Sequence, residues 1–199
     1  MANKTKHIAI FASGNGSNFE AIVQACADGH LAARVVLLVC DKPGAYVIER
    51  ANKWSIPVFE FEPKEYAYKA EYEAEIIRFL KAHRVDWICL AGYMRLVSTV
   101  LLNEYEGRII NIHPSLLPAF KGLRAIEQAY EYGVKITGVT THFVDNTLDG
   151  GTIIDQVAIP TEGCDLEELQ RRIHTAEHEL YVKTINTLLA STPLSDRDN

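Results

Sequence analysis

Residues 7–27 read HIAIFASGNGSNFEAIVQACA. The stretch opens on an apolar run with the length of a buried strand, and its second half, residues 19–27, carries the spacing of an amphipathic helix. Between them lies a short loop rich in glycine and small polar residues. A strand, a tight loop and a helix in this order predict the first half of a parallel β-α-β unit.

The same alternation continues along the chain. Further apolar runs of strand length occur at 35–40, 58–61, 87–91 and 109–112. Helical patterns lie among these runs at 45–52 and 66–83. Strands that alternate with helices predict an α/β fold with a doubly wound, mostly parallel sheet.

The pattern changes in the C-terminal part of the chain. Residues 136–144 and 151–159 have the composition of two long strands, and the polar loop 145–150 joins them. This arrangement favours antiparallel pairing of the two strands. A long final helix is expected from about residue 166 to 189, with Asp165 as its N-cap.

The bulk composition limits the class of protein. The chain has 199 residues, of which 48% are hydrophobic, and shows no linker or repeat, so we expect one domain over 1–190 and a polar tail at 191–199. The 26 acidic and 20 basic residues give a formal charge of −6 with no basic stripe, which argues against a nucleic-acid partner. The cysteines are scattered, there is no signal peptide, and no apolar run approaches the roughly 18 residues of a membrane span. We therefore expect a cytoplasmic protein with reduced thiols and no membrane partner.

The segment 111–118, NIHPSLLP, carries the strongest chemical signal. If the apolar run before it is a strand that ends near Pro114, Asn111 and His113 share one face at its carboxyl end. An amide can donate hydrogen bonds to a developing oxyanion, and an imidazolium adds charge and can pass on a proton. The pair thus suggests acyl or one-carbon transfer. The alternative is that both residues only cap a strand and form a turn.

The loop of residues 13–18 would present backbone N–H groups at the start of the first helix, which suits a phosphate group. Ser17 and Asn18 could cap this helix and add side-chain hydrogen bonds. A dinucleotide site is an alternative, with Asp41 as the acidic ribose ligand, but Phe19 stands three residues after Gly16 where the dinucleotide motif has a glycine or alanine. A plain tight turn is the third interpretation.

Four segments, in this order and at these separations, resemble the folate-dependent formyltransferases: 14–18, 92–96, 111–118 and 148–151. The resemblance is best to the glycinamide ribonucleotide transformylases and covers about residues 7 to 190. It implies a Rossmann-like fold whose N-terminal half binds the nucleotide and whose C-terminal half contributes to the folate pocket. It also implies formyl transfer from 10-formyltetrahydrofolate to glycinamide ribonucleotide in de novo purine biosynthesis, by a monomer or homodimer.

The catalytic residues that the resemblance implies are Asn111, His113 and Asp149. The substrate amine would attack the formyl carbon directly, and Asn111 and His113 would donate to the oxyanion of the tetrahedral intermediate. Asp149 would favour the imidazolium form of His113 and help to remove the amine proton, without a covalent enzyme intermediate. On its own, Asp149 could equally be the turn residue of an Asp-Gly pair.

The resemblance also implies ligand contacts. Those for the nucleotide phosphate and the glycinamide are Gly16, Ser17, Asn18 and Glu177. Those for the folate are Lys69, Met94, Arg95, Leu96, Val97 and Asn111. Lys64 is close enough in sequence to compete with Lys69 for the basic position.

The remaining histidines have less defined roles. His142 lies in a strand pattern and is interpreted as support for the active site. His174 and His178 are four residues apart on the final helix, a spacing that can bind a metal, but no third ligand is suggested and the chemistry needs no metal. We therefore expect no metal site. His174 fits a solvated helix position as well as a substrate contact.

Three other functions compete with glycinamide ribonucleotide formylation. Formyltetrahydrofolate hydrolases and methionyl-tRNA formyltransferases share the Asn, His and Asp, but the former carry an additional N-terminal module and the latter a C-terminal nucleic-acid domain, and neither is expected here. The third is a nucleotide-binding or dinucleotide-dependent protein in which only the glycine loop is functional.

Overall fold

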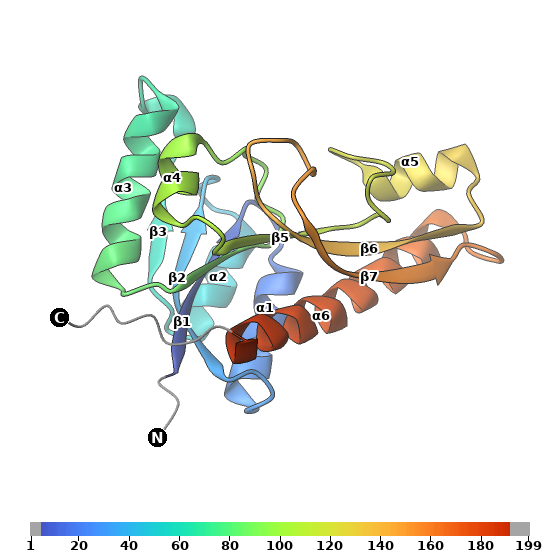
Figure 1. Ribbon diagram of the computed structural model, residues 1–199, viewed down its shortest axis with the longest axis horizontal. Coiled ribbons are helices and arrows are strands. Elements are labelled where there is room, and N and C mark those ends of the chain that lie inside the picture. The colour runs from blue at the N-terminus through green and yellow to red at the C-terminus, as the bar shows by residue number, and fades with distance from the viewer. Residues whose placement is uncertain (1–4, 192–199) are drawn as a thin grey trace.

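The computed structural model describes residues 5–191, and one seven-stranded sheet runs through this part of the chain with helices on both of its faces (Figure 1). The strands are β1 (Lys6–Ala12), β2 (Ala33–Cys40), β3 (Val58–Glu60), β4 (Trp87–Leu90), β5 (Ile109–His113), β6 (Ile136–Phe143) and β7 (Ile153–Pro160). Their order in the sheet is β3-β2-β1-β4-β5-β6-β7. The first five strands are parallel, and β6 and β7 pair antiparallel, which confirms the predicted fold class.

The helices are α1 (Ser17–Ala27), α2 (Tyr46–Lys53), α3 (Lys69–Ala82), α4 (Thr99–Glu104), α5 (Ala125–Tyr132) and α6 (Leu166–Ser191), with a 3-10 turn η1 (Pro63–Glu65) before α3. The predicted N-cap of α6 is confirmed, because an Asp165 carboxylate oxygen accepts from the Glu168 N–H at 2.8 Å. The predicted polar tail lies, from residue 192 on, outside the described residues.

Two short helices, α4 and α5, occupy stretches to which the sequence analysis assigned no element. The start of α4 is capped by Ser98, whose hydroxyl accepts from the Val100 N–H at 3.2 Å. The end of α5 is set by Gly133 in the left-handed region, at φ 77°. Both helices are too short to show a clear helical periodicity, so in the sequence only their cap residues indicate them.

The core lies in two layers, because successive side chains of a strand point to opposite faces of the sheet. On β1, Ile8 and Ile10 face the layer built with α1, α2 and α6, whereas Ala9 and Phe11 face the layer of α3 and α4. All four side chains are fully buried. A central strand apolar on both faces is the expected result for a parallel sheet covered by helices.

The long helix α6 is bonded directly to β4 and to β5, the strand that carries Asn111 and His113. The hydroxyl of the fully buried Tyr181 reaches the backbone carbonyls of Leu90, at 2.9 Å, and Ile110, at 3.1 Å. Because a buried hydroxyl needs a partner, this contact fixes α6 against the carboxyl end of β4 and the first half of β5.

Candidate active site

The candidate active site forms where the parallel strands end. The carboxyl ends of β1, β2, β4 and β5 lie along one edge of the sheet, the usual place for ligands in an open α/β fold. The loop between β6 and β7, orange in Figure 1, returns to this edge and carries Asp149. Segments far apart in the sequence therefore meet at one site.

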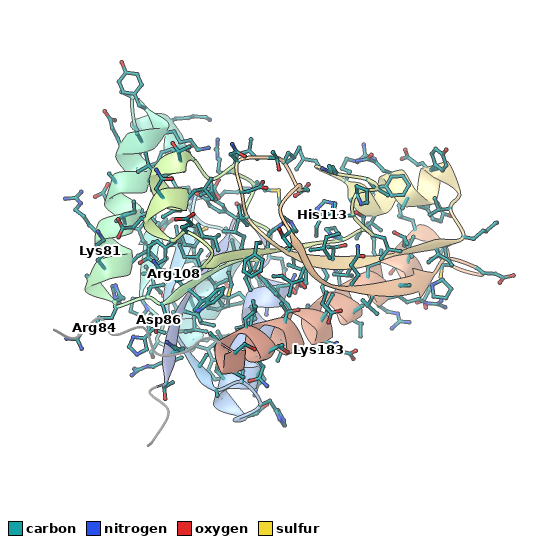
Figure 2. All side chains as sticks on the ribbon, in the orientation of Figure 1. Lys81, Arg84, Asp86, Arg108, His113 and Lys183 are labelled. Atoms are coloured by element: carbon teal, nitrogen blue, oxygen red, sulfur yellow. The ribbon has the colours of Figure 1, made fainter. Side chains whose placement is uncertain are left out.

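The three predicted catalytic residues are brought together. Asn111 and His113 are two residues apart on β5, so their side chains share one face of the sheet. His113 is the last residue of the strand (Figure 2) and is 5% exposed. The Nδ1 atom of His113 lies 3.6 Å from Oδ2 of Asp149. Asn111 pairs across the sheet with His142, and the Nδ2 atom of Asn111 lies 3.1 Å from Nε2 of His142. The cluster thus contains an amide donor, an imidazole and a carboxylate.

The segment 119–122 holds two members of this cluster. Nε2 of His113 lies 2.9 Å from the Phe120 carbonyl, and the Gly122 N–H donates to Oδ2 of Asp149 at 2.8 Å. Because a carbonyl only accepts, Nε2 of His113 carries the hydrogen, and Nδ1 is the nitrogen that faces Asp149. A proton on Nδ1 would therefore face a carboxylate oxygen.

His142 orients the amide of Asn111. Its Nδ1 lies 2.8 Å from the Phe143 carbonyl and must donate to it, so Nε2 is left as the acceptor for the Asn111 N–H. Burial lowers the pKa of His142 from its usual value, which favours this neutral form. The contact supports the interpretation of His142 as a residue that positions the active site.

We expect His142→Phe to lower kcat about tenfold, because the Asn111 N–H would lose its acceptor, at a cost of about 1–3 kcal/mol. In His142→Gln the amide oxygen can take over as acceptor, so kcat should stay within about threefold of the wild type. Steady-state kinetics of both variants measures the difference. Equal kcat values for His142→Phe and the wild type would contradict the positioning role.

The burial of His142 also predicts a pH dependence of folding. Because the folded-state pKa of His142 is lowered, the folded chain binds fewer protons than the unfolded chain, and stability is lost as the pH falls below the unfolded value of about 6.5. Urea unfolding at about pH 7.5 and about pH 5.5 should therefore show a larger loss in the wild type than in His142→Gln. An equal loss in both proteins would assign the effect to other groups.

The glycine loop leads into α1 as predicted, but the helix is capped differently. Gly16 is the N-cap, at φ 78°, and no side chain caps the helix, so the predicted capping by Ser17 or Asn18 is wrong. A Cβ at Gly16 would lie 2.4 Å from Cγ2 of Val47, so glycine is required there for close packing as well as for its φ. The Oδ1 atom of Asn18 is buried and has no hydrogen-bond partner among the described residues. The first-turn N–H groups of α1 suit an anion, whereas Oδ1 of Asn18 is an acceptor and would need a donor from a ligand.

Helix α2 braces this loop, a feature that sequence reasoning missed. The Val47 N–H donates to the Gly14 carbonyl at 3.1 Å. Arg50 donates to the Asn15 backbone carbonyl at 2.9 Å and to the Asn15 side-chain oxygen at 3.0 Å. It also pairs with Glu20 of α1 at 3.1 Å. The sequence does not indicate that Arg50 holds the glycine loop, because the partners of this arginine depend on how α2 packs on α1.

The predicted folate segment follows β4 at the same edge of the sheet. Met94 and Leu96 are 59% and 60% exposed, whereas Val97 is buried. Nε of Arg95 donates to Oδ2 of Asp41 at 2.9 Å, so the Arg95 guanidinium is directed toward the end of β2. The segment therefore offers two apolar side chains and its backbone to a flat heterocycle.

The basic position of the folate pocket stays a prediction. Lys69 is the first residue of α3, four residues before Glu73, and so lies on the same helix face. The buried Glu73 accepts from the Ser98 N–H at 2.9 Å, which places this face beside the end of the folate segment. Lys64 is exposed in η1. The position of Lys69 on the face of Glu73 favours it over Lys64.

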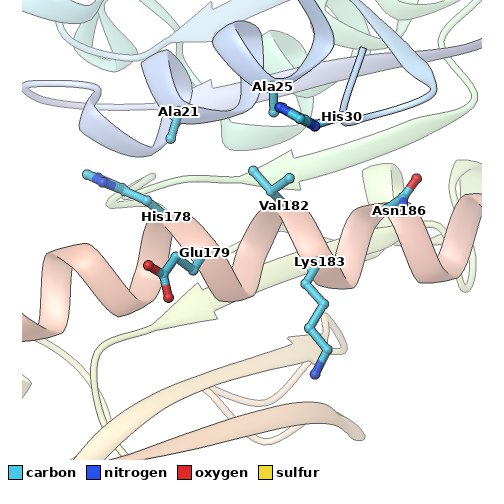
Figure 3. A pocket seen from close by; sticks show the side chains of 8 residues that line it. All are labelled: Ala21, Ala25, His30, His178, Glu179, Val182, Lys183 and Asn186. Atoms are coloured by element: carbon cyan, nitrogen blue, oxygen red, sulfur yellow. The ribbon is translucent and has the colours of Figure 1, made fainter. Parts of the chain in front are cut away.

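On α6, Glu177 is buried and accepts a hydrogen bond from Nδ1 of His174 at 2.8 Å. This bond raises the pKa of His174. The next residue, His178, points toward α1 near Ala21 (Figure 3). Glu177 therefore lies on the turn of α6 that faces the first half of α1, the helix that the glycine loop opens.

A shallow groove between α1 and α6 contains none of the predicted site residues (Figure 3); it is lined by Ala21, Ala25, His30, His178, Glu179, Val182, Lys183 and Asn186. Within residues 5–191, no three His, Cys, Asp or Glu side chains gather as a metal site would require. In the same range, no helix is long and apolar enough to cross a membrane. The four cysteines are unpaired.

Comparisons with known proteins agree with this geometry. Residues 6–185 match the formyl transferase family model. The chain is 54% identical over 185 residues to phosphoribosylglycinamide formyltransferase of Bacillus subtilis (strain 168), covering 92% of this chain and 95% of that protein. Among solved structures, glycinamide ribonucleotide transformylase 1 from Geobacillus kaustophilus matches at TM-score 0.91 and 56% identity, over 94% of this chain and 100% of that one. Phosphoribosylglycinamide formyltransferase from Bacillus halodurans matches at TM-score 0.92 and 50% identity, over 97% and 100%. The chain therefore belongs to the formyl transferase family, and the Bacillus subtilis and Bacillus halodurans relatives named above are phosphoribosylglycinamide formyltransferases.

Proposed function

We propose that this protein transfers the formyl group of 10-formyltetrahydrofolate to the amine of phosphoribosylglycinamide, giving formylglycinamide ribonucleotide and tetrahydrofolate in de novo purine biosynthesis. The observation that carries the proposal is the cluster of Asn111, His113 and Asp149 at the end of β5. The identity of 54% to the Bacillus subtilis enzyme supports the choice of substrates.

The nucleotide phosphate would bind at the first turn of α1, and the folate heterocycle beside the segment 94–97. In this arrangement Ser17, Asn18 and the backbone N–H of Gly16 serve the phosphate, whose negative charge suits a helix N-terminus. Glu177, on the turn of α6 that faces α1, would accept from the hydroxyl or amine groups of the nucleotide.

In the reaction, the amine lone pair forms a bond to the formyl carbon, and the carbonyl electrons move onto oxygen. The Asn111 N–H and the imidazole of His113 would stabilise this oxyanion. In the structure, Nε2 of His113 contacts the Phe120 carbonyl. To donate to the oxyanion, this N–H group must first leave that carbonyl. The amine proton leaves toward Asp149 directly or through a water, and N10 of the folate takes up a proton as its bond to carbon breaks.

The dinucleotide alternative is disfavoured by the contacts of Asp41. One carboxylate oxygen accepts from the Ser13 hydroxyl and the other from Nε of Arg95. The side chain is 6% exposed. A carboxylate engaged on both oxygens inside the protein is poorly placed to bind a ribose.

The proposed partners are therefore the two small-molecule substrates. The expected absence of a nucleic-acid partner, the choice between monomer and homodimer, and the cytoplasmic location stay predictions. A gel-filtration measurement with light scattering would settle the oligomeric state.

The function is tested by mixing purified protein with 10-formyltetrahydrofolate and following tetrahydrofolate formation with and without the nucleotide. Turnover that depends on the nucleotide is the expected result. Release of formate in its absence would instead identify a hydrolase, and no reaction in either mixture would favour the nucleotide-binding alternative.

Asn18→Ala should raise the KM for the nucleotide about tenfold, because a hydrogen bond to a charged phosphate contributes about 1.5–3 kcal/mol. The KM for the folate should change by less than about twofold. Asn103→Ala, an exposed position on α4, serves as the control. An unchanged nucleotide KM in Asn18→Ala would place the phosphate elsewhere.

A further inference from the structure

A closed ring of hydrogen bonds joins the ends of three neighbouring strands, β2, β1 and β4. The Ser13 hydroxyl accepts from the Met94 N–H at 2.9 Å and donates to Oδ1 of Asp41. Oδ2 of Asp41 accepts from Nε of Arg95 at 2.9 Å, and Arg95 follows Met94 in the chain. The Ser13 N–H also donates to the Gly92 carbonyl at 3.1 Å.

Two members of this ring are buried, whereas the Arg95 side chain is 43% exposed. Ser13 and Asp41 are 7% and 6% exposed. A buried carboxylate is tolerated only when hydrogen bonds and an opposite charge compensate it, so Asp41 requires both of its partners. Removal of the negative charge would leave the Arg95 guanidinium without its charged acceptor.

The ring of hydrogen bonds holds the proposed folate segment more directly than it holds the glycine loop. The backbone of 92–95, in the proposed folate segment, is held through Gly92, Met94 and Arg95. The glycine loop begins immediately after Ser13 but has its own brace on α2, through Val47 and Arg50. Loss of the ring should therefore loosen the folate segment and leave the nucleotide loop supported.

We propose that Asp41 is a positioning residue for the folate co-substrate. It acts through Arg95 and Ser13, which hold the backbone of Gly92–Arg95 where the heterocycle binds. This inference rests on the proposed placement of the folate beside residues 94–97. No contact between Asp41 and either substrate is involved.

The test is Asp41→Asn, which keeps the shape of the side chain but removes its charge. We expect the KM for 10-formyltetrahydrofolate to rise about tenfold, the cost of weakening charged hydrogen bonds, and the nucleotide KM to stay within about twofold. Arg95→Ala should raise the folate KM similarly. The double variant should be no worse than the poorer single variant, because both changes break one interaction.

The matched control is Asp86→Asn. Asp86 lies at the amino end of β4, far from His113 (Figure 2), and also accepts a backbone hydrogen bond, from the His7 N–H at 2.9 Å. A loss of stability without a change in folate KM is expected for it. Thermal unfolding of both variants separates general destabilisation from positioning.

Leu96→Ala distinguishes failure of this inference from failure of the proposed folate site. If Leu96→Ala raises the folate KM but Asp41→Asn leaves it within about twofold, the positioning role of Asp41 is wrong. The proposed folate site beside residues 94–97 would then still stand. If neither variant changes the folate KM, the folate binds elsewhere and both ideas fail. An equal rise of both substrate KM values in Asp41→Asn would show general loosening and would also overturn the inference.

Discussion

Replacing His113 with alanine is expected to lower kcat about 10³-fold, the loss typical of a group that both stabilises an oxyanion and transfers a proton. The imidazole is buried at the end of β5, and its Nδ1 atom faces the Asp149 carboxylate. The nucleotide KM should change by less than about threefold, because the phosphate is bound at α1. Steady-state kinetics with both substrates varied gives the two constants.

The control for this variant is His30→Ala, an exposed histidine of the α1–α6 groove. It should retain the activity of the wild type. If His113→Ala keeps more than about a tenth of the wild-type kcat, then His113 is not a catalytic residue.

Asp149→Asn is expected to lower kcat about 10²-fold, because the amide keeps the shape but cannot stabilise an imidazolium or accept the amine proton. Asp149 has φ 46°, a left-handed conformation that asparagine adopts readily, and an amide oxygen can still accept from the Gly122 N–H. The variant should therefore fold normally. Its kcat, measured beside its unfolding midpoint, isolates the effect of the charge.

Asp145→Asn is the matched control, since Asp145 is exposed in the same loop and its carboxylate accepts from Thr147. Its kcat should stay within about threefold of the wild type. A comparable loss in Asp145→Asn and Asp149→Asn would mean that any change in this loop disturbs activity, and Asp149 would then have no specific role.

The sheet and the pair on β5 could be predicted because they depend on local patterns. The alternation of apolar runs with helical spacing specifies a parallel sheet, and a period of two places Asn111 and His113 on one face. The relation of Asp149 to this pair came from the resemblance to a family. It could not come from spacing alone, since 35 residues, which include α5 and β6, separate Asp149 from His113.

The contacts that orient these groups could not be predicted, because they depend on register and strand order. His142 meets Asn111 only because β6 pairs with β5 in one antiparallel register. Asp41 meets Arg95 only because β2, β1 and β4 are neighbours in the sheet. The wrong prediction of a side-chain cap on α1 has a similar cause, since the close approach of Val47 to Gly16 is a tertiary contact.

The most direct test of the central claim is the single-turnover rate of formyl transfer in a triple variant, Asn111→Ala/His113→Ala/Asp149→Asn, with enzyme in excess and with the Kd of each substrate measured by calorimetry. If the three residues act as one unit on one intermediate, the triple variant should be slower than the wild type by about 10³-fold and within about tenfold of His113→Ala alone. The nucleotide Kd should stay within about threefold, whereas the folate Kd rises only by the loss of the Asn111 contact. A triple variant that transfers the formyl group at more than about a tenth of the wild-type rate would contradict the account and place the chemistry outside this cluster.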